Sequence, residues 1–407
     1  MCELKISRLG AEGDGIADGP AGAIYVQGGL PGECVLAEVN GRWGRLVRPV
    51  QASADRVQAV CPHFGTCGGC AAQHMSASLY RSWKQEVVRA AFAHRGLEAE
   101  IAPLQAIPAG TRRRAVFTVC RGRQGARLGY REEGSHVLVD IEVCPVLVPA
   151  IAQALAALRE VASVALGPGA SGRMTVTATP VGLDVALDSE GAATGVAARA
   201  AIVDAVERHR IARLMLNDDL VAMRAQPTLS FGGAAVALPP GAFVQAVAES
   251  EAVMTDLILA AAGRAKRVAD LFCGIGTFTL PLARKARVLA MDGDGAAIAA
   301  LKGAALRPGL KAIEAKVRDL LREPLSRMEL EPFEAVIFDP PRAGAKAQAE
   351  ALAKSKVPLV IAVSCNPATL ARDVRILVDG GYCIERVVPI DQFVFSAQVE
   401  AVAILSR

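Results

Sequence analysis

The sequence has no apolar run approaching the roughly 18 residues that cross a bilayer, although hydrophobic residues make up 52% of its 407 positions. Its N-terminal stretch, MCELKISRLG, lacks the apolar core that secretory signals carry. There is no internal repeat and no low-complexity tail. These absences argue against a membrane or secreted protein, and we predict a cytoplasmic one.

Cysteine is too sparse for a disulfide scaffold, because ten cysteines in 407 residues do not resemble a short, cysteine-dense secreted chain. Three of them nevertheless fall within CPHFGTCGGC, at Cys61, Cys67 and Cys70. In a reducing compartment such a local cluster indicates metal binding or catalysis.

The net charge of +4 is weak support for a nucleic-acid partner, but the distribution of arginine is more informative. The stretch TRRRAVFTVCRGRQGARLGYR, residues 111–131, contains seven arginines and no acidic residue. Uncompensated arginines favour phosphate contacts over the alternative of a solvated sheet face. We therefore predict substrate contacts from Arg112, Arg113 and Arg114, while Phe117 fits a core position as well as a stacking one.

The length predicts two or three domains of about 150 residues each. Short strand-like runs in residues 1–56 predict a small β-barrel, and residues 57–240 mix strands and helices in an α+β pattern, with a helix from about 77 to 94. Residues 241–407 begin with a helix at about 244–262 and then alternate buried strands with helices. That alternation predicts a doubly wound, Rossmann-like parallel sheet, which binds ligands beyond the carboxyl ends of its strands.

A glycine-rich turn, DLFCGIG at residues 270–276, follows the first strand of this region. Asp292 ends the next strand, 22 residues after Asp270, where a carboxylate accepts hydrogen bonds from a ribose. A dinucleotide fingerprint would have a third glycine where Thr279 stands. The pattern predicts a nucleoside cofactor and favours S-adenosylmethionine over NAD; an ordinary tight turn is the alternative.

Two further strand ends carry reactive groups. DPPRAG places Asp339 at one of them, and SCNPATLARD places Cys365 just before a helix N-terminus, which lowers a thiol pKa from about 8.5. The alternatives are a strand-terminating turn and a small buried hydrophobe. We assign Cys273 and Cys383 to the buried hydrophobes.

Spacing alone leaves two interpretations of the cysteine cluster. Zinc would use the three close cysteines and His74. A [4Fe–4S] cluster would use the same cysteines and a remote fourth, for which Cys144, followed by a proline, is the natural candidate.

These motifs together resemble the RNA uracil-5 methyltransferase family, in particular its iron–sulfur members that modify 23S ribosomal RNA. The resemblance spans nearly the whole chain and is carried by CPHFGTCGGC, CPVL, DLFCGIGTFTLPLA, FDPPRAG and SCNPATLARD. It implies a TRAM-like (OB-like) barrel and a [4Fe–4S] cluster on Cys61, Cys67, Cys70 and Cys144. It also implies that Cys365 is the nucleophile and Glu400 the base. Asp339 would contact uracil or position the cofactor, and the remaining residues implied around S-adenosylmethionine are Gln245, Asp270, Gly274, Asp292 and Asp319.

The implied chemistry follows from the poor nucleophilicity of uracil C5. A thiolate that adds to C6 turns C5 into an enolate carbon able to take a methyl group. A base then removes the C5 proton and the thiol is eliminated. One departure concerns Gln398, which stands where many members have a histidine.

The expected function is methylation of a uridine in 23S ribosomal RNA by a monomeric enzyme. The presence of the iron–sulfur motif and the barrel favours ribosomal over transfer RNA, which is the alternative substrate. A non-catalytic RNA-binding or ribosome-assembly factor is a second alternative, against which Cys365, Glu400 and Asp339 count. A methyltransferase for exocyclic amines would have an aromatic residue after the prolines, where this chain has Arg342.

Overall fold

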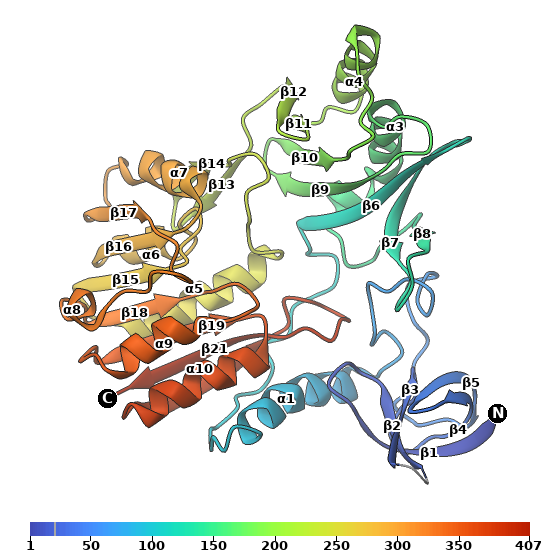
Figure 1. Ribbon diagram of the computed structural model, residues 1–407, viewed down its shortest axis with the longest axis horizontal. Coiled ribbons are helices and arrows are strands. Elements are labelled where there is room, and N and C mark those ends of the chain that lie inside the picture. Colours follow the sequence, from blue (N-terminus) through green and yellow to red (C-terminus); the bar gives the residue numbers. More distant parts are fainter. Residues whose placement is uncertain (20–21) are drawn as a thin grey trace.

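The computed structural model describes residues 1–19 and 22–407. It contains a small barrel near the N-terminus, a central α/β domain and a C-terminal α/β domain (Figure 1). Helix α1, from the N-terminal third of the chain, packs on the C-terminal domain. Among the described residues no helix is both long and apolar enough to span a membrane.

The N-terminal strands close into the predicted barrel, in the order β1-β2-β3-β5-β4, with β4 pairing back onto β1. Alternation in these strands places small aliphatic side chains inside, such as Val35 and Ala37 of β4, both fully buried. The strands are β1 (Cys2–Leu9), β2 (Gly15–Gly19), β3 (Gly22–Gln27), β4 (Cys34–Asn40) and β5 (Trp43–Gln51).

Helix α1 (Ala77–Ala93) begins where Ser76 caps it, its hydroxyl accepting from the backbone N–H of Leu79. Its apolar face, including Val88 and Phe92, packs into the core of the C-terminal domain. The segment that follows α1 pairs with strand β20 (Cys383–Ile390) through bridges at Ile101 and Gln105. The N-terminal third of the chain is thereby fastened to the C-terminal sheet.

The central domain is a seven-stranded sheet in the order β12-β11-β10-β9-β6-β7-β8, and its core packs helices α3 and α4 against it. Phe117 of β6 is fully buried there, so it is a core residue. The strands are β6 (Arg114–Gly122), β7 (Gly125–Arg131), β8 (Leu138–Asp140), β9 (Ser171–Thr179), β10 (Gly182–Asp188), β11 (Arg213–Leu216) and β12 (Asp219–Met223); the helices are α2 (Pro149–Ala152), α3 (Leu155–Ala165) and α4 (Val196–Arg208).

The C-terminal sheet has the order β17-β16-β15-β18-β19-β21-β20, parallel except for β21. The predicted doubly wound fold is confirmed, with the strand order reversing between β15 and β18. Its strands are β15 (Arg267–Leu271), β16 (Arg287–Asp292), β17 (Ile313–Val317), β18 (Ala335–Phe338), β19 (Leu359–Ser364) and β21 (Glu400–Ser406).

Helices flank this sheet, and a hairpin of β13 (Thr228–Phe231) and β14 (Ala234–Ala237) packs beside α7. The predicted helix at about 244–262 begins later, as α5 (Ala248–Ala262), because its N-cap residue Val247 has an extended backbone. The other helices are α6 (Thr279–Ala283), α7 (Gly295–Ala305), α8 (Arg327–Leu330), α9 (Lys346–Ala353) and α10 (Pro367–Asp379). The division at residues 56 and 240 stays a prediction.

Cys383, predicted to be buried, is exposed. It begins β20, the edge strand of the sheet, where the first residues face solvent. That prediction was wrong because residue type alone does not distinguish an edge strand from a central one.

Candidate active site

A cavity of about 570 Å³ opens at the carboxyl ends of the parallel strands, at the point where the strand order reverses. The segments after β15, β16, β17, β18 and β19 all contribute to its wall. The predicted site residues that line it are Gln245, Gly274, Asp292, Asp319, Asp339, Cys365 and Glu400. Residues that lie up to 155 positions apart in the chain (245 to 400) thus meet in one place.

One end of the cavity has the features of a nucleoside site. Gly274 has φ +53°, and a Cβ built there would meet nothing within 4 Å, so the backbone is open to a ligand. Its N–H donates to Asp292 Oδ2 over 2.8 Å, and Asp292 Oδ1 accepts from the N–H of Asp294 at the same distance. These bonds fix the carboxylate of Asp292 at the cavity wall, where it can accept from ribose hydroxyls.

Asp270, predicted to contact the cofactor, does not line this cavity. Its side chain is fully buried, and burial raises its pKa to about 7. Oδ2 accepts from the Thr279 hydroxyl over 2.5 Å, joining the end of β15 to the start of α6. Asp270 therefore supports the glycine turn from beneath. The predicted contact between Asp270 and the cofactor is corrected accordingly.

The other end of the cavity contains a chain of buried amides and carboxylates. Gln392 donates through Nε2 to Gln245 Oε1 over 2.8 Å and to Glu400 Oε2 over 2.9 Å. Gln245 in turn donates to Asp339 Oδ2 over 2.9 Å, and the Ser250 hydroxyl donates to Gln392 Oε1 over 2.6 Å. Gln392 therefore ties together the carboxylates that end β18 and begin β21.

Glu400 is buried, and its Oε1 is without a hydrogen-bond partner among the described residues. Burial, with repulsion from Asp339, raises the pKa of Glu400 well above its usual value, and burial raises that of Asp339 to about 7. A carboxylate in this environment gains from taking up a proton, as a general base must.

Cys365 lies half-buried at the N-terminus of α10, as predicted, but its pKa is not lowered. Burial, followed by the negative charges of Glu400 and Asp339, raises it to about 11. Arg342 acts in the opposite direction without overcoming these effects. Burial and the two carboxylates therefore oppose the predicted lowering by the helix N-terminus, so the thiol requires activation before it can attack.

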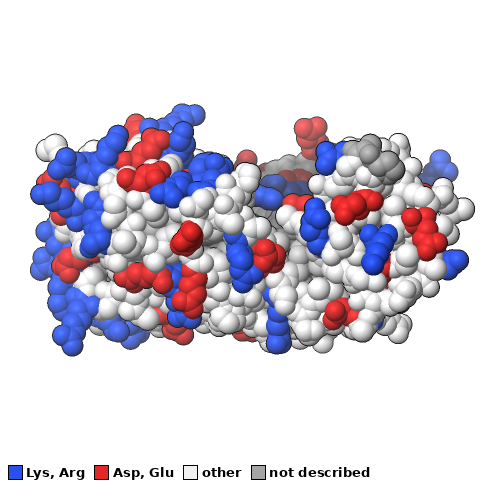
Figure 2. Space-filling model, turned by 90° about the horizontal axis from the view of Figure 1, so that it is seen from below, with Lys and Arg blue, Asp and Glu red and all other residues white. Residues whose placement is uncertain are grey.

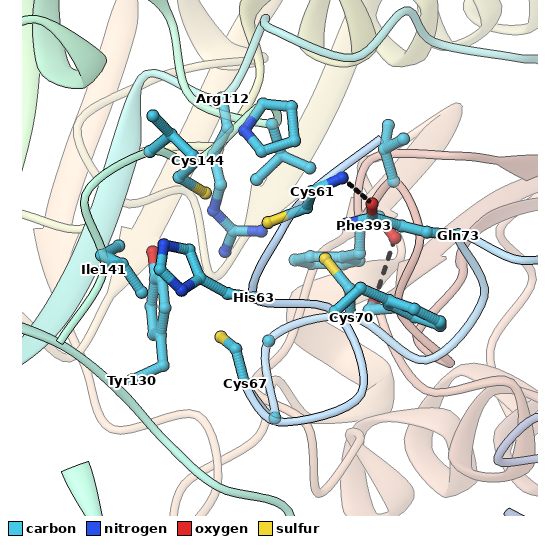
Figure 3. Close-up of a pocket in the computed structure, with 18 of the residues that line it drawn as sticks. Cys61, His63, Cys67, Cys70, Gln73, Arg112, Tyr130, Ile141, Cys144 and Phe393 are labelled. Atoms are coloured by element: carbon cyan, nitrogen blue, oxygen red, sulfur yellow. Dashed lines mark hydrogen bonds between the residues drawn. The ribbon is translucent and has the colours of Figure 1, made fainter. Parts of the chain in front are cut away.

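A second cavity, of about 240 Å³, collects four cysteines (Figure 3). Cys61, Cys67 and Cys70 approach from one loop and Cys144 from the central domain, and their sulfur atoms face the shared space. The loop is held by the N–H of Cys61, which donates to Gln73 Oε1 over 3.0 Å. Burial raises the pKa of Cys144 to about 11 and also raises those of Cys67 and Cys70.

The histidine of the zinc alternative lies outside this cavity. His74 is buried, stacks on Phe64 with ring centroids 5.4 Å apart and does not line the cavity. Within residues 1–19 and 22–407, no group of three or more His, Cys, Asp or Glu side chains is close enough to hold one metal ion.

The three predicted substrate-binding arginines have different surroundings. Arg113 is largely buried and pairs with Glu251 over 2.5 Å, which identifies a structural ion pair and removes the basis for an RNA contact. Arg112 lines the cysteine cavity with its guanidinium 5.7 Å from the ring centre of Phe393. Arg114 lies 5.5 Å from the ring centre of Phe243, and of these two residues only Phe243 lines the candidate active site.

Sequence reasoning missed Gln392, Phe393 and Phe243. The first two follow β20, and Asp391 and Gln392 are a polar pair after an apolar strand, the same signal that identified Asp339. Phe393 lines both the cysteine cavity and the candidate active site. Phe243 had no signal beyond its place in the FxQ segment, yet its side chain is 66% exposed at the cavity.

Comparisons with known proteins agree with this geometry. The family model described as tRNA (Uracil-5-)-methyltransferase matches residues 310–407. An uncharacterized RNA methyltransferase of Brucella suis biovar 1 (strain 1330) is 47% identical over 407 residues, covering 100% of this chain and 98% of that protein. The 23S rRNA (uracil(1939)-C(5))-methyltransferase RlmD of Halomonas elongata is 34% identical over 442 aligned positions, covering 100% of this chain and 89% of that protein.

Among solved structures, the tRNA (uracil-54, C5)-methyltransferase of Pyrococcus abyssi in complex with S-adenosyl-L-homocysteine has the same fold. The TM-score is 0.77 at 22% identity, over 99% of this chain and 100% of that one. The relatives that align over nearly their whole length establish the relationship. The chain belongs to the S-adenosylmethionine-dependent RNA uracil-5 methyltransferase family.

Proposed function

We propose that this enzyme methylates C5 of a uridine in 23S ribosomal RNA through a covalent adduct between Cys365 and C6 of the base. The observation that carries the proposal is the meeting of Cys365, Glu400 and Asp339 at one cavity with the open glycine turn at Gly274. S-adenosylmethionine, bound along that turn and Asp292, supplies an electrophilic methyl group.

Formation of the adduct begins at Cys365. The sulfur bonds to C6, the C5–C6 double bond opens, and the electron pair reaches C5 and O4 as an enolate. Because the pKa of the free thiol is about 11, its proton must pass to water or to the neighbouring carboxylate of Asp339 as uracil enters. Asp339, with a pKa of about 7 and a hydrogen bond from Gln245, is positioned to hold the uracil ring.

Resolution of the adduct belongs to Glu400. After C5 has taken the methyl group, Glu400 removes the C5 proton, the electron pair reforms the C5–C6 double bond, and the sulfur leaves C6. The raised pKa of Glu400 favours this proton uptake, and the hydrogen bond from Gln392 holds its other oxygen in place. The Oε1 atom, which has no partner within residues 1–19 and 22–407, would face the proton.

The choice of 23S ribosomal RNA is supported by the Halomonas relative, which is named for that substrate. Transfer RNA is the second candidate, since the matching family model and the Pyrococcus structure are named for it. A target base must leave its stack to reach Cys365, so either substrate presents a splayed loop.

The cysteine cavity is proposed to hold a [4Fe–4S] cluster on Cys61, Cys67, Cys70 and Cys144. Four thiols around one cavity are the ligand set that this group takes, and the histidine of the zinc alternative lies outside that cavity. The cluster would fasten the cysteine loop to the central domain at Cys144. Methyl transfer from a sulfonium consumes no electrons, so the role proposed here is structural.

Nucleoside mass spectrometry tests the reaction and the substrate class together. Unmodified 23S ribosomal RNA and transfer RNA are each incubated with the protein and methyl-labelled S-adenosylmethionine, with Cys365→Ala as control. Labelled 5-methyluridine in the ribosomal pool is expected. Label in transfer RNA alone would select the second candidate, and label in neither pool would refute the proposal.

Iron and acid-labile sulfide analysis tests the cluster. Anaerobically purified protein should hold about four of each per chain. Cys144→Ser should lose most of both, while Cys383→Ser, which alters an exposed thiol on β20, should retain them. One zinc and no iron in the native chain would overturn the proposal.

A further inference from the structure

The edge of the C-terminal sheet opposite the active site is strongly basic. Parallel strands begin at a common edge, so the segments that lead into β15, β16 and β17 lie side by side. Figure 2 shows Lys and Arg side chains gathered at the corresponding end of the molecule, on the left. The exposed basic residues of these three segments are Arg264, Lys266, Arg267, Arg284, Lys285, Arg287, Arg307 and Lys311, and we call this set the basic edge.

These charges are poorly compensated. Within the described part of the chain, Lys266, Arg267 and Arg287 form no ion pair with a carboxylate. Glu334, at the neighbouring start of β18, accepts from the backbone N–H of Lys266 over 3.0 Å and is exposed. The eight positive charges of the basic edge exceed the net charge of +4 of the whole chain.

Two of the arginines lie side by side at the starts of adjacent strands. Arg267 of β15 and Arg287 of β16 are register partners in adjacent parallel strands, which lie about 4.8 Å apart. Like charges directly opposite on neighbouring strands are destabilising. Nothing in the fold requires two guanidinium groups here, since both side chains are exposed and neither fills the core. A polyanionic ligand would turn this repulsion into a favourable interaction.

We propose that the basic edge is a second RNA-binding surface, which holds the phosphate backbone of a distant part of the substrate. The inference rests on the proposed RNA substrate and adds a contact remote from the reacting base. Strands of five or six residues separate the two edges, about 17–20 Å at about 3.3 Å per residue. The two edges face opposite sides of the domain, so a short hairpin whose loop occupies the cavity at Cys365 lies against one edge, whereas a large folded RNA can wrap around the domain to the other.

We favour RNA over an acidic protein for two reasons. The proposed active site at the opposite edge of the same sheet binds an RNA base, and lysine and arginine side chains at several strand starts match the repeated phosphates of an RNA backbone. No apolar patch accompanies the charges: the segments consist of charged residues, glycine, alanine, proline and two leucines.

Salt-dependent binding tests the proposal. The triple variant K266Q/R267Q/R287Q is compared with R199Q/R208Q/R224Q, which removes the same charge from exposed arginines that are engaged elsewhere, by a backbone carbonyl or by acidic side chains. The probes are an unmodified 23S ribosomal RNA transcript and a short hairpin around the uridine that labelling identifies. Filter binding gives the slope of log K against log salt concentration.

For the long transcript, the basic-edge variant should reduce that slope by about 2, because each lost phosphate contact contributes about 0.7 to 0.9. Its affinity should fall by about tenfold or more, while hairpin methylation and control-variant binding stay at the wild-type level. R267K/R287K, which retains the charge, should bind normally.

An unchanged slope and affinity for the long transcript would overturn the proposal. Equal losses in both triple variants would also overturn it, because they would reflect net charge rather than this surface. If the native chain methylates neither RNA, the proposed function fails. Binding of the long transcript still shows whether the basic edge binds RNA.

Discussion

Lys84 offers the sharpest test of how the active-site loop is held. It is fully buried on α1, and its ammonium lies 3.1 Å from Asp391, which is 2% exposed. The same ammonium donates to the carbonyls of Phe393 and Gln398, and Asp391 also accepts from the Tyr80 hydroxyl over 2.8 Å. This network fixes the segment between Gln392 and Glu400.

Lys84→Met removes the cation and leaves Asp391 buried without its counter-charge. Removing one partner of a buried ion pair costs about 3–5 kcal/mol of unfolding free energy, and we expect that loss here. Adding Asp391→Asn should recover a large part of it, because the unpaired charge then disappears. Arg89→Met, which breaks an exposed pair with Glu86 on the same helix, is the matched control and should cost under about 1 kcal/mol.

Urea denaturation followed by tryptophan fluorescence measures these losses. Trp83 lies beside Lys84 and is buried, and Trp43→Phe removes the other tryptophan, which is exposed in the barrel. A loss below about 1 kcal/mol for Lys84→Met, or no recovery in the double variant, would refute the reasoning.

Two further predictions concern the candidate active site. Because burial and two carboxylates raise the pKa of Cys365 to about 11, its alkylation by iodoacetamide should accelerate about tenfold per pH unit from about pH 7 to about pH 9, as followed by peptide mass spectrometry. Glu400→Gln, which removes one of those charges, should speed alkylation at about pH 8, and a plateau near that pH in the native chain would contradict the assignment. Gly276→Ala should weaken S-adenosylmethionine binding and lower the melting temperature, at a cost of about 1–3 kcal/mol, because φ is +97° there and a Cβ would lie 2.5 Å from Leu301. Calorimetry that shows native affinity and stability for this variant would contradict the role of the turn.

Much of the site could be predicted because it follows from the order of strands. In a parallel sheet the carboxyl ends of all strands lie at one edge. The sequence alone therefore predicted that Asp292, Asp339 and Cys365 lie close together. The same reasoning failed for Asp270, the next-to-last residue of β15, whose side chain is buried. Side chains alternate between the two faces of a strand, and the sequence alone does not show which residues take which face.

Electrostatic properties were the least predictable. The helix N-terminus behind Cys365 was visible in the sequence, but the burial of Glu400 and Asp339 beside the thiol was not. Gln392 and Lys84 were missed for the same reason: their importance lies in partners 147 and 307 positions away, at Gln245 and Asp391. Spacing within one motif has no access to such contacts.

Trapping the covalent intermediate tests the central claim most directly. Glu400→Gln retains the shape of the base but cannot remove the C5 proton, so the variant should stall after methyl transfer. Mass spectrometry of the variant, after incubation with 23S ribosomal RNA and S-adenosylmethionine and ribonuclease digestion, should find a methylated uridine nucleotide on the peptide that contains Cys365. Full turnover to 5-methyluridine by this variant, or an adduct on any other residue, would contradict the account.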